Sequence, residues 1–111
     1  MPRSAKVYLE DILAAADRIH RYVGGRPLEG FRRDEMAVDA VVRNLEIIGE
    51  AAKQVPEEVR QQTPEVPWSK VAGLRDILAH QYFVVDLEIV WDVIQNKLPP
   101  LEAAVRRLLD R

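Results

Sequence analysis

The chain has 111 residues, of which 48% are hydrophobic, carries a net charge of −2 and contains no cysteine. This length fits a single domain over residues 1–111 with its own core, the lack of cysteine excludes disulfides and thiolate metal sites, and the slight negative charge excludes a generally basic surface for nucleic acid. The first residues, MPRSAKVYLED, lack the apolar stretch of a signal peptide, and no apolar run approaches about 20 residues, so we expect a soluble, cytoplasmic protein without a membrane partner.

The first predicted helix runs from about Ser4 to Val23. Its apolar residues recur at the three- and four-residue spacing of one helix face, and Gly24-Gly25 ends it. A connector over residues 26–33 follows, and we expect Phe31 to hold it against the core.

The second predicted helix begins at Asp34 or Glu35 and continues to about Val55, where Pro56 stops it. Its apolar residues occupy more of the circumference than in an ordinary surface helix. The sequence therefore predicts that this helix is central in a bundle or packs on a second copy of the chain.

Shorter elements follow. Residues 57–62 favour one or two helical turns, and the link over residues 63–67 is extended because each proline disfavours α geometry in the residue before it. We expect a third major helix from Trp68 or Ser69 to about Ala79, a fourth beginning at the N-cap Asp86, and a last one beginning at Pro99-Pro100. The sum is an all-α, up-and-down bundle of four main helices plus a short C-terminal helix.

The chemistry concentrates in the octapeptide RDILAHQY, from Arg75 to Tyr82. Arginine binds phosphate, histidine transfers protons near neutral pH, and tyrosine offers a hydroxyl. On an ideal helix Arg75 and Tyr82 share a face, whereas His80 points about 140° away at 100° per residue. Arg75 and His80 can therefore meet on one phosphate only if the helix ends or distorts near His80, or if a second protomer supplies one of them. A purely structural role for the three side chains is the alternative.

RDILAHQY resembles the signature Arg, four residues, His, any residue, Tyr of HEPN-domain proteins of the HepT-like toxin family. The resemblance extends to residues 8–25, which look like the first helix of that family, to residues 43–60, which look like the second, and to residues 67–99, which look like the third and fourth. It thus covers nearly the whole chain. It implies a small helical HEPN-like toxin, homodimeric and metal-independent, that cleaves RNA as an endoribonuclease.

The resemblance also implies residue roles and a partner. Arg75 and His80 become the catalytic pair, and no cofactor or metal is implied. The partner is a minimal nucleotidyltransferase antitoxin of the MntA type, which binds the toxin and adds AMP to the motif tyrosine, here Tyr82. Asp76 departs from the family, which often has asparagine there, and a carboxylate beside Arg75 would weaken a phosphate contact.

The polar face of the second helix is a stripe of opposite charges at i, i+3 and i, i+4 spacing: Asp39, Arg43, Glu46, Glu50 and Lys53. A solvated, ion-paired face is one reading. In the other, part of the stripe lines a dimer cleft, where Arg43 or Glu46 would support and orient the motif, with Asp76 as a further supporting candidate.

Two residues of the first predicted helix have a spacing that resembles part of a metal-binding motif. Asp17 and His20 have the Asp-x-x-His spacing, but a di-iron bundle needs two Glu-x-x-His motifs and further glutamates. We therefore predict no metal site and expect His20 at the surface.

A second function from a different class also fits the sequence: a non-catalytic helical subunit that docks a nucleotidyltransferase and assists it in binding nucleotide or substrate. The intact Arg75/His80 pair favours the ribonuclease, whereas the slight net acidity and Asp76 favour the binding subunit.

Overall fold

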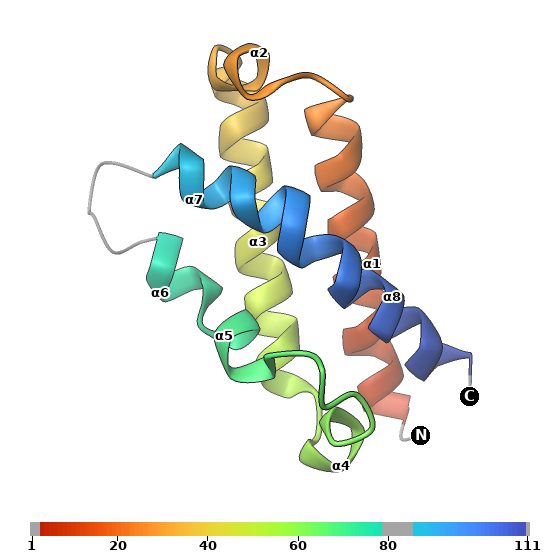
Figure 1. The fold of residues 1–111 in the computed structure, drawn as a ribbon. Helices are drawn as coiled ribbons and strands as arrows, with labels where there is room; N and C mark the ends of the chain where they lie inside the picture. Colours follow the sequence, from red (N-terminus) through yellow and green to blue (C-terminus); the bar gives the residue numbers. More distant parts are fainter. Residues whose placement is uncertain (1–2, 79–85, 111) are drawn as a thin grey trace.

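The computed structural model describes residues 3–78 and 86–110, except the side chains of Arg75 and Ile77. Every regular element in this part is helical, which confirms the all-α fold. Two long helices, α1 (Arg3–Val23) and α3 (Glu35–Gln54), lie antiparallel and side by side (Figure 1). Their bounds agree with the predicted ones to within a residue or two. The core between them consists of fully buried side chains on the predicted apolar stripes, including Leu9, Ile12, Ile19, Val41, Leu45 and Ile48.

The connection between α1 and α3 contains more regular structure than predicted. Gly24 and Gly25 have φ values of 61° and 72°, which glycine adopts without strain. The connector then forms a short helix, α2 (Leu28–Arg32), which the sequence analysis missed. Phe31 is fully buried as expected, and its ring centroid lies 5.6 Å from that of Trp91.

Arg26 joins the end of α1 to the start of α3. Its Nε donates to the Val23 carbonyl at 3.0 Å, and its guanidinium pairs with Asp34 at 3.0 Å. Asp34 is the N-cap of α3 and accepts a hydrogen bond from the Ala37 amide at 3.1 Å. This backbone hydrogen bond and the Arg26 side chain hold the pKa of Asp34 below its ordinary value.

The predicted continuous third helix is wrong. After α4 (Glu57–Arg60), the chain forms two short helices, α5 (Trp68–Ala72) and α6 (Leu74–Leu78), with Gly73 between them. Gly73 has φ −87° and ψ 5°, outside the α-helical region. Glycine has a low helix propensity, and the change of direction lets both short helices pack on α3.

The predicted start of a separate helix at Pro99-Pro100 is also wrong. The helix α7 (Leu87–Asp92), capped by Asp86 as expected, continues through a π-helical turn, η1 (Val93–Lys97), into α8 (Leu98–Leu109). A proline ring clashes with the carbonyl four residues earlier in a regular α-helix. In the wider turn the Leu98 amide donates to the Val93 carbonyl, five residues back, and the helix continues past both prolines.

The continuous helix formed by α7, η1 and α8 crosses obliquely over the pair of α1 and α3, with α8 packed on α1 (Figure 1). The helices α5 and α6 cover α3 beside it. None of the helices in the described part of the chain has the length and apolarity that crossing a bilayer requires.

Candidate active site

The motif helix α6 is seated on α3 through Gly49. A Cβ atom added at Gly49 would lie 3.3 Å from the carbonyl oxygen of Val71, 3.5 Å from that of Ala72 and 3.6 Å from the Cβ of Leu74. The end of α5 and the start of α6 therefore approach the backbone of α3 more closely than a larger residue would allow. Leu74, which is buried in this contact, directly precedes Arg75.

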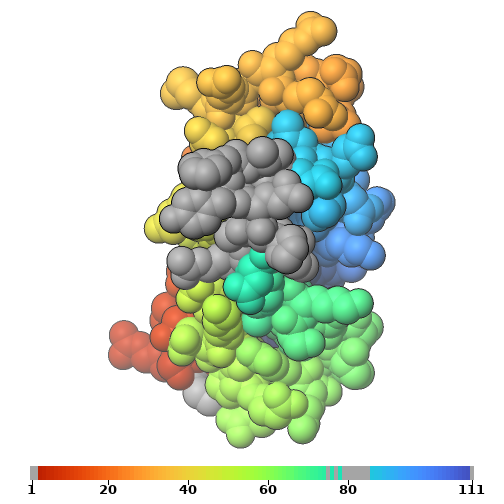
Figure 2. Space-filling model, turned by 90° about the vertical axis from the view of Figure 1, so that its left-hand side faces the viewer, coloured from red at the N-terminus to blue at the C-terminus, as the bar shows by residue number. Residues whose placement is uncertain are grey.

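Only part of the predicted constellation falls within the described residues. The backbone of Arg75 lies in α6, one residue after the Gly49 contact, and the Asp76 side chain is exposed on the same short helix. His80 and Tyr82 lie outside the described residues, as does the helix break expected near His80. The face of the molecule that carries α5 and α6 also carries α7 (Figure 2).

Arg43 and Glu46 lie together on α3. Their side chains form an ion pair at 3.7 Å, with Arg43 72% exposed and Glu46 31% exposed. Glu46 lies one helical turn before Gly49, so it borders the seat of α6. No hydrogen bond or ion pair joins either side chain to Asp76 among the contacts of the described residues.

The rest of the stripe is exposed, and two of its members form an ion pair. Lys53 contacts Glu50 at 3.4 Å, and Asp39 is exposed. This arrangement matches the solvated face that the spacing predicts. Within the described residues of one chain, the Arg43–Glu46 pair is the contact that these two candidate residues make.

His20 has a partner that sequence reasoning missed. Its Nε2 lies 2.8 Å from a carboxylate oxygen of Glu102, whose side chain on α8 is only 8% exposed. Glu102 falls on the apolar stripe of α8, four residues after Leu98 and three before Val105, which was the available signal. Within the described part of the chain, no three His, Cys, Asp or Glu side chains gather to hold a metal ion.

Comparison with known proteins adds the family. A family model described as "Ribonuclease HepT-like" matches residues 12–108. The chain belongs to the HepT-like ribonuclease family. That match includes α3, α6 and the whole octapeptide, and it confirms the resemblance that the motif suggested.

Two relatives match this chain over nearly its whole length. A "Putative RNase" of Caldanaerobacter subterraneus subsp. tengcongensis is 40% identical over 109 residues, which are 98% of this chain and 97% of that protein. A "Probable ribonuclease HepT" of Thermococcus cleftensis is 40% identical over 108 residues, which are 97% of this chain and 98% of that protein. No solved structure matches the chain significantly.

Proposed function

We propose that this HepT-like chain is a metal-independent endoribonuclease, with Arg75 and His80 as its catalytic pair, and that it acts as the toxin of a type II toxin–antitoxin pair. The observation that carries the proposal is the complete Arg-x₄-His-x-Tyr pattern inside a family match over residues 12–108. The seat of α6 on Gly49 supports it, because a catalytic arginine needs a rigid support and its helix packs closely on α3, one of the two long helices that enclose the core.

The proposed reaction uses the nucleophile that RNA itself carries. His80 removes the proton of a ribose 2′-hydroxyl, the 2′-oxygen forms a bond to the adjacent phosphorus, and the bond from phosphorus to the 5′-oxygen breaks. The departing 5′-oxygen takes a proton from solvent, and His80 returns the proton it removed to solvent, so that the products are a 2′,3′-cyclic phosphate and a 5′-hydroxyl. The Arg75 guanidinium binds the phosphate and stabilises the charge that develops on its oxygens.

Three further side chains would modulate this site. Asp76 follows Arg75 directly and its carboxylate is exposed, so it competes with phosphate for the guanidinium. Arg43 and Glu46, which form an ion pair on α3, would help to orient the motif. Asp76→Asn is expected to raise the cleavage rate, whereas Asp39→Asn, an exposed change on the far part of the stripe, is expected to leave it unchanged.

The proposed active form is a homodimer. The octapeptide supplies one histidine per chain, so a two-fold axis would bring two motifs to one composite site. Met36 at the start of α3 is 85% exposed, so a charge at this position would be tolerated in a monomer and would be unfavourable in an interface formed by that helix. Sedimentation equilibrium tests this proposal: a dimer that Met36→Glu weakens is expected, and a wild-type monomer at all concentrations would contradict it.

Tyr82 is the proposed point of control. A nucleotidyltransferase antitoxin would bind the toxin and transfer AMP from ATP to the Tyr82 hydroxyl, forming a phosphate ester and releasing pyrophosphate. The added phosphate would occupy the anion site that RNA needs. Mass spectrometry of the chain co-expressed with its partner checks this, and an AMP adduct confined to peptides without Tyr82 would refute it.

Expression in cells distinguishes the toxin function from the second candidate function, a non-catalytic binding subunit, which the exposed Asp76 supports. The wild-type gene is induced alone, beside its His80→Ala variant, with both proteins quantified in the soluble fraction. We expect growth arrest with the wild type only. Equal growth of both strains at equal protein levels would instead favour a non-catalytic subunit that docks a nucleotidyltransferase.

A further inference from the structure

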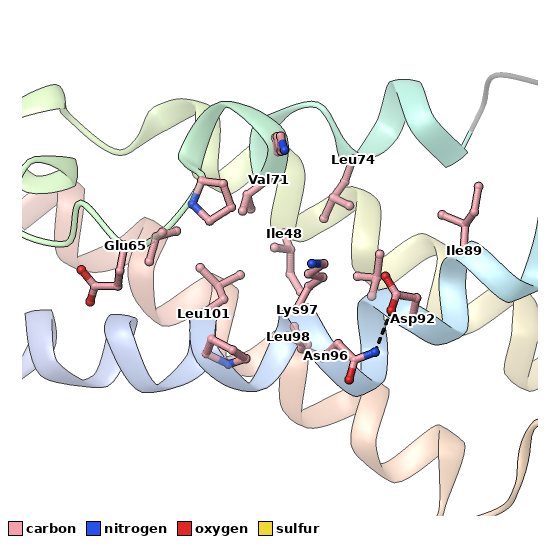
Figure 3. Close-up of a pocket in the computed structure, with 15 residues that line it drawn as sticks. Ile48, Glu65, Val71, Leu74, Ile89, Asp92, Asn96, Lys97, Leu98 and Leu101 are labelled. Carbon is pink, nitrogen blue, oxygen red and sulfur yellow. Dashed lines mark hydrogen bonds between the residues drawn. The ribbon is translucent and has the colours of Figure 1, made fainter.

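An apolar groove lies between two parts of the fold that are distant in sequence. One wall is formed by α5 and α6, the other by α7, η1 and the start of α8, and Ile48 of α3 lies between them (Figure 3). Its volume is about 530 Å³, within the range typical of small-molecule sites. The apolar lining comes chiefly from Ile48, Val71, Leu74, Val93, Leu98 and Leu101.

The shape of the groove limits what can occupy it. Its lining residues on the second wall run from Ile89 to Leu101, which at 1.5 Å per residue is roughly 18 Å of helix. An alkyl chain fits, because apolar atoms pack at about 4.0–4.5 Å from one another.

The groove is lined by two lysines and two carboxylates, and it keeps a surplus of one positive charge because one carboxylate is paired with an arginine outside the lining. Lys70 of α5 and Lys97 of η1 line opposite walls, both are exposed, and neither forms an ion pair with an acidic residue that the structure describes. One acidic side chain on the groove, Glu65, pairs with Arg107 of α8. The other is Asp92, which accepts a hydrogen bond from Asn96 at 2.7 Å.

We propose that this groove binds an amphipathic carboxylate. The alkyl chain would lie along the apolar walls, and the carboxylate would contact the ammonium groups of Lys70 and Lys97. The apolar walls supply the hydrophobic contribution, and the two lysines select an anionic over a cationic head group. The ribonuclease mechanism uses neither lysine, so this binding site goes beyond the proposed function and stands or falls independently of it.

Calorimetric titration of the whole chain with dodecanoate, below its micelle concentration, tests the proposal. Dodecanoate is expected to bind, and decanoate to bind up to about 15-fold more weakly, because each buried methylene contributes about fourfold. Dodecyltrimethylammonium, which has the same tail and the opposite charge, is expected to bind more weakly than dodecanoate. Chemical shifts of ¹⁵N-labelled amides are expected to change along α5 and η1.

Variants assign the head group. Lys70→Gln with Lys97→Gln is expected to weaken dodecanoate binding by up to about tenfold. Asp92→Asn is expected to strengthen it by removing a like charge. Lys6→Gln is the matched control, because Lys6 is an exposed lysine on α1 outside the groove. The affinity of this variant for dodecanoate is expected to equal that of the wild type.

Three results would overturn the proposal: no binding of dodecanoate below its micelle concentration, equal affinity for the two head groups, or an unchanged affinity in the folded double lysine variant. Binding of an acidic amphipathic peptide to this face, with none of the alkyl carboxylates bound, would assign the groove to a polypeptide and would equally contradict it. None of these measurements uses RNA cleavage.

Discussion

Gly49 offers a direct test of how the motif helix is held. In the interior of a helix, replacing glycine by alanine stabilises a protein by roughly 0.5–1 kcal/mol, because alanine loses less backbone entropy on folding. At Gly49 the new methyl group would meet the Val71 carbonyl at 3.3 Å and the Leu74 Cβ at 3.6 Å. A contact of 3.3 Å to backbone oxygen forces α5 and α6 to move by a few tenths of an ångström, and overpacking of this kind costs about 1–3 kcal/mol.

The two contributions oppose each other, and we expect crowding to dominate. Gly49→Ala should lower the free energy of unfolding by about 1 kcal/mol, and Gly49→Val by more, because valine adds two further methyl groups and a lower helix propensity. Gly30→Ala on α2 is the control, since its added Cβ meets nothing closer than 3.6 Å. That variant should be neutral or more stable.

Urea unfolding of the three variants, followed by circular dichroism, measures these free energies. The slope of the unfolding free energy with urea should be unchanged, because the same surface is exposed on unfolding. If Gly49→Ala stabilised the chain as much as Gly30→Ala does, the close approach of α5 and α6 to α3 would not be a constraint, and the reasoning would fail.

Three other predictions concern single contacts. The pKa of Asp34 is lowered in the folded state, so its charged form stabilises the fold above the ordinary pKa of 3.8, and this stabilisation is lost as the pH falls below that value. The melting-temperature difference between the wild type and Asp34→Asn should therefore shrink in acid. A constant difference down to pH 2 would contradict this. His20→Ala removes the partner of the buried Glu102 carboxylate, and should cost about 1–3 kcal/mol by thermal unfolding, whereas Glu102→Gln in the same background should recover much of that loss. Trp68→Phe removes the 3.1 Å hydrogen bond from its Nε1 to the Thr63 hydroxyl and should cost about 1 kcal/mol; a variant as stable as the wild type would show that this bond contributes nothing net.

Much of the fold follows from local signals in the sequence. The apolar spacing of α1 and α3, the glycine pair after Val23 and the N-caps Asp34 and Asp86 correctly predicted where those helices begin or end. These signals succeed because amphipathic periodicity and capping act within one or two turns.

The predicted helix boundaries are wrong where contacts or backbone geometry beyond the local sequence pattern determine the structure. The break at Gly73 depends on the packing of α5 and α6 against Gly49, a contact across some 24 positions that no local pattern reveals. The prolines at 99 and 100 indicated a helix start, yet the π turn before them keeps the helix continuous.

The candidate site remains a prediction from the sequence. The spacing within the octapeptide proposes Arg75, His80 and Tyr82, of which the structure describes only the backbone of Arg75, whereas the i, i+3 pair of Arg43 and Glu46 forms as its spacing predicts. That α6 is held at the backbone of α3 could not be predicted, because a glycine on a helix signals close approach only once its neighbour is known.

RNA cleavage by the purified chain tests the central claim most directly. The wild type, Arg75→Ala and His80→Ala are compared in EDTA on one labelled RNA, with His20→Ala and Arg21→Ala as matched controls from α1 and the folded fraction of each measured by thermal unfolding. We predict cleavage by the wild type and both controls, products with 2′,3′-cyclic phosphate ends, and a loss of about 10²–10⁴-fold in each motif variant. Wild-type rates in folded Arg75→Ala and His80→Ala would contradict the account.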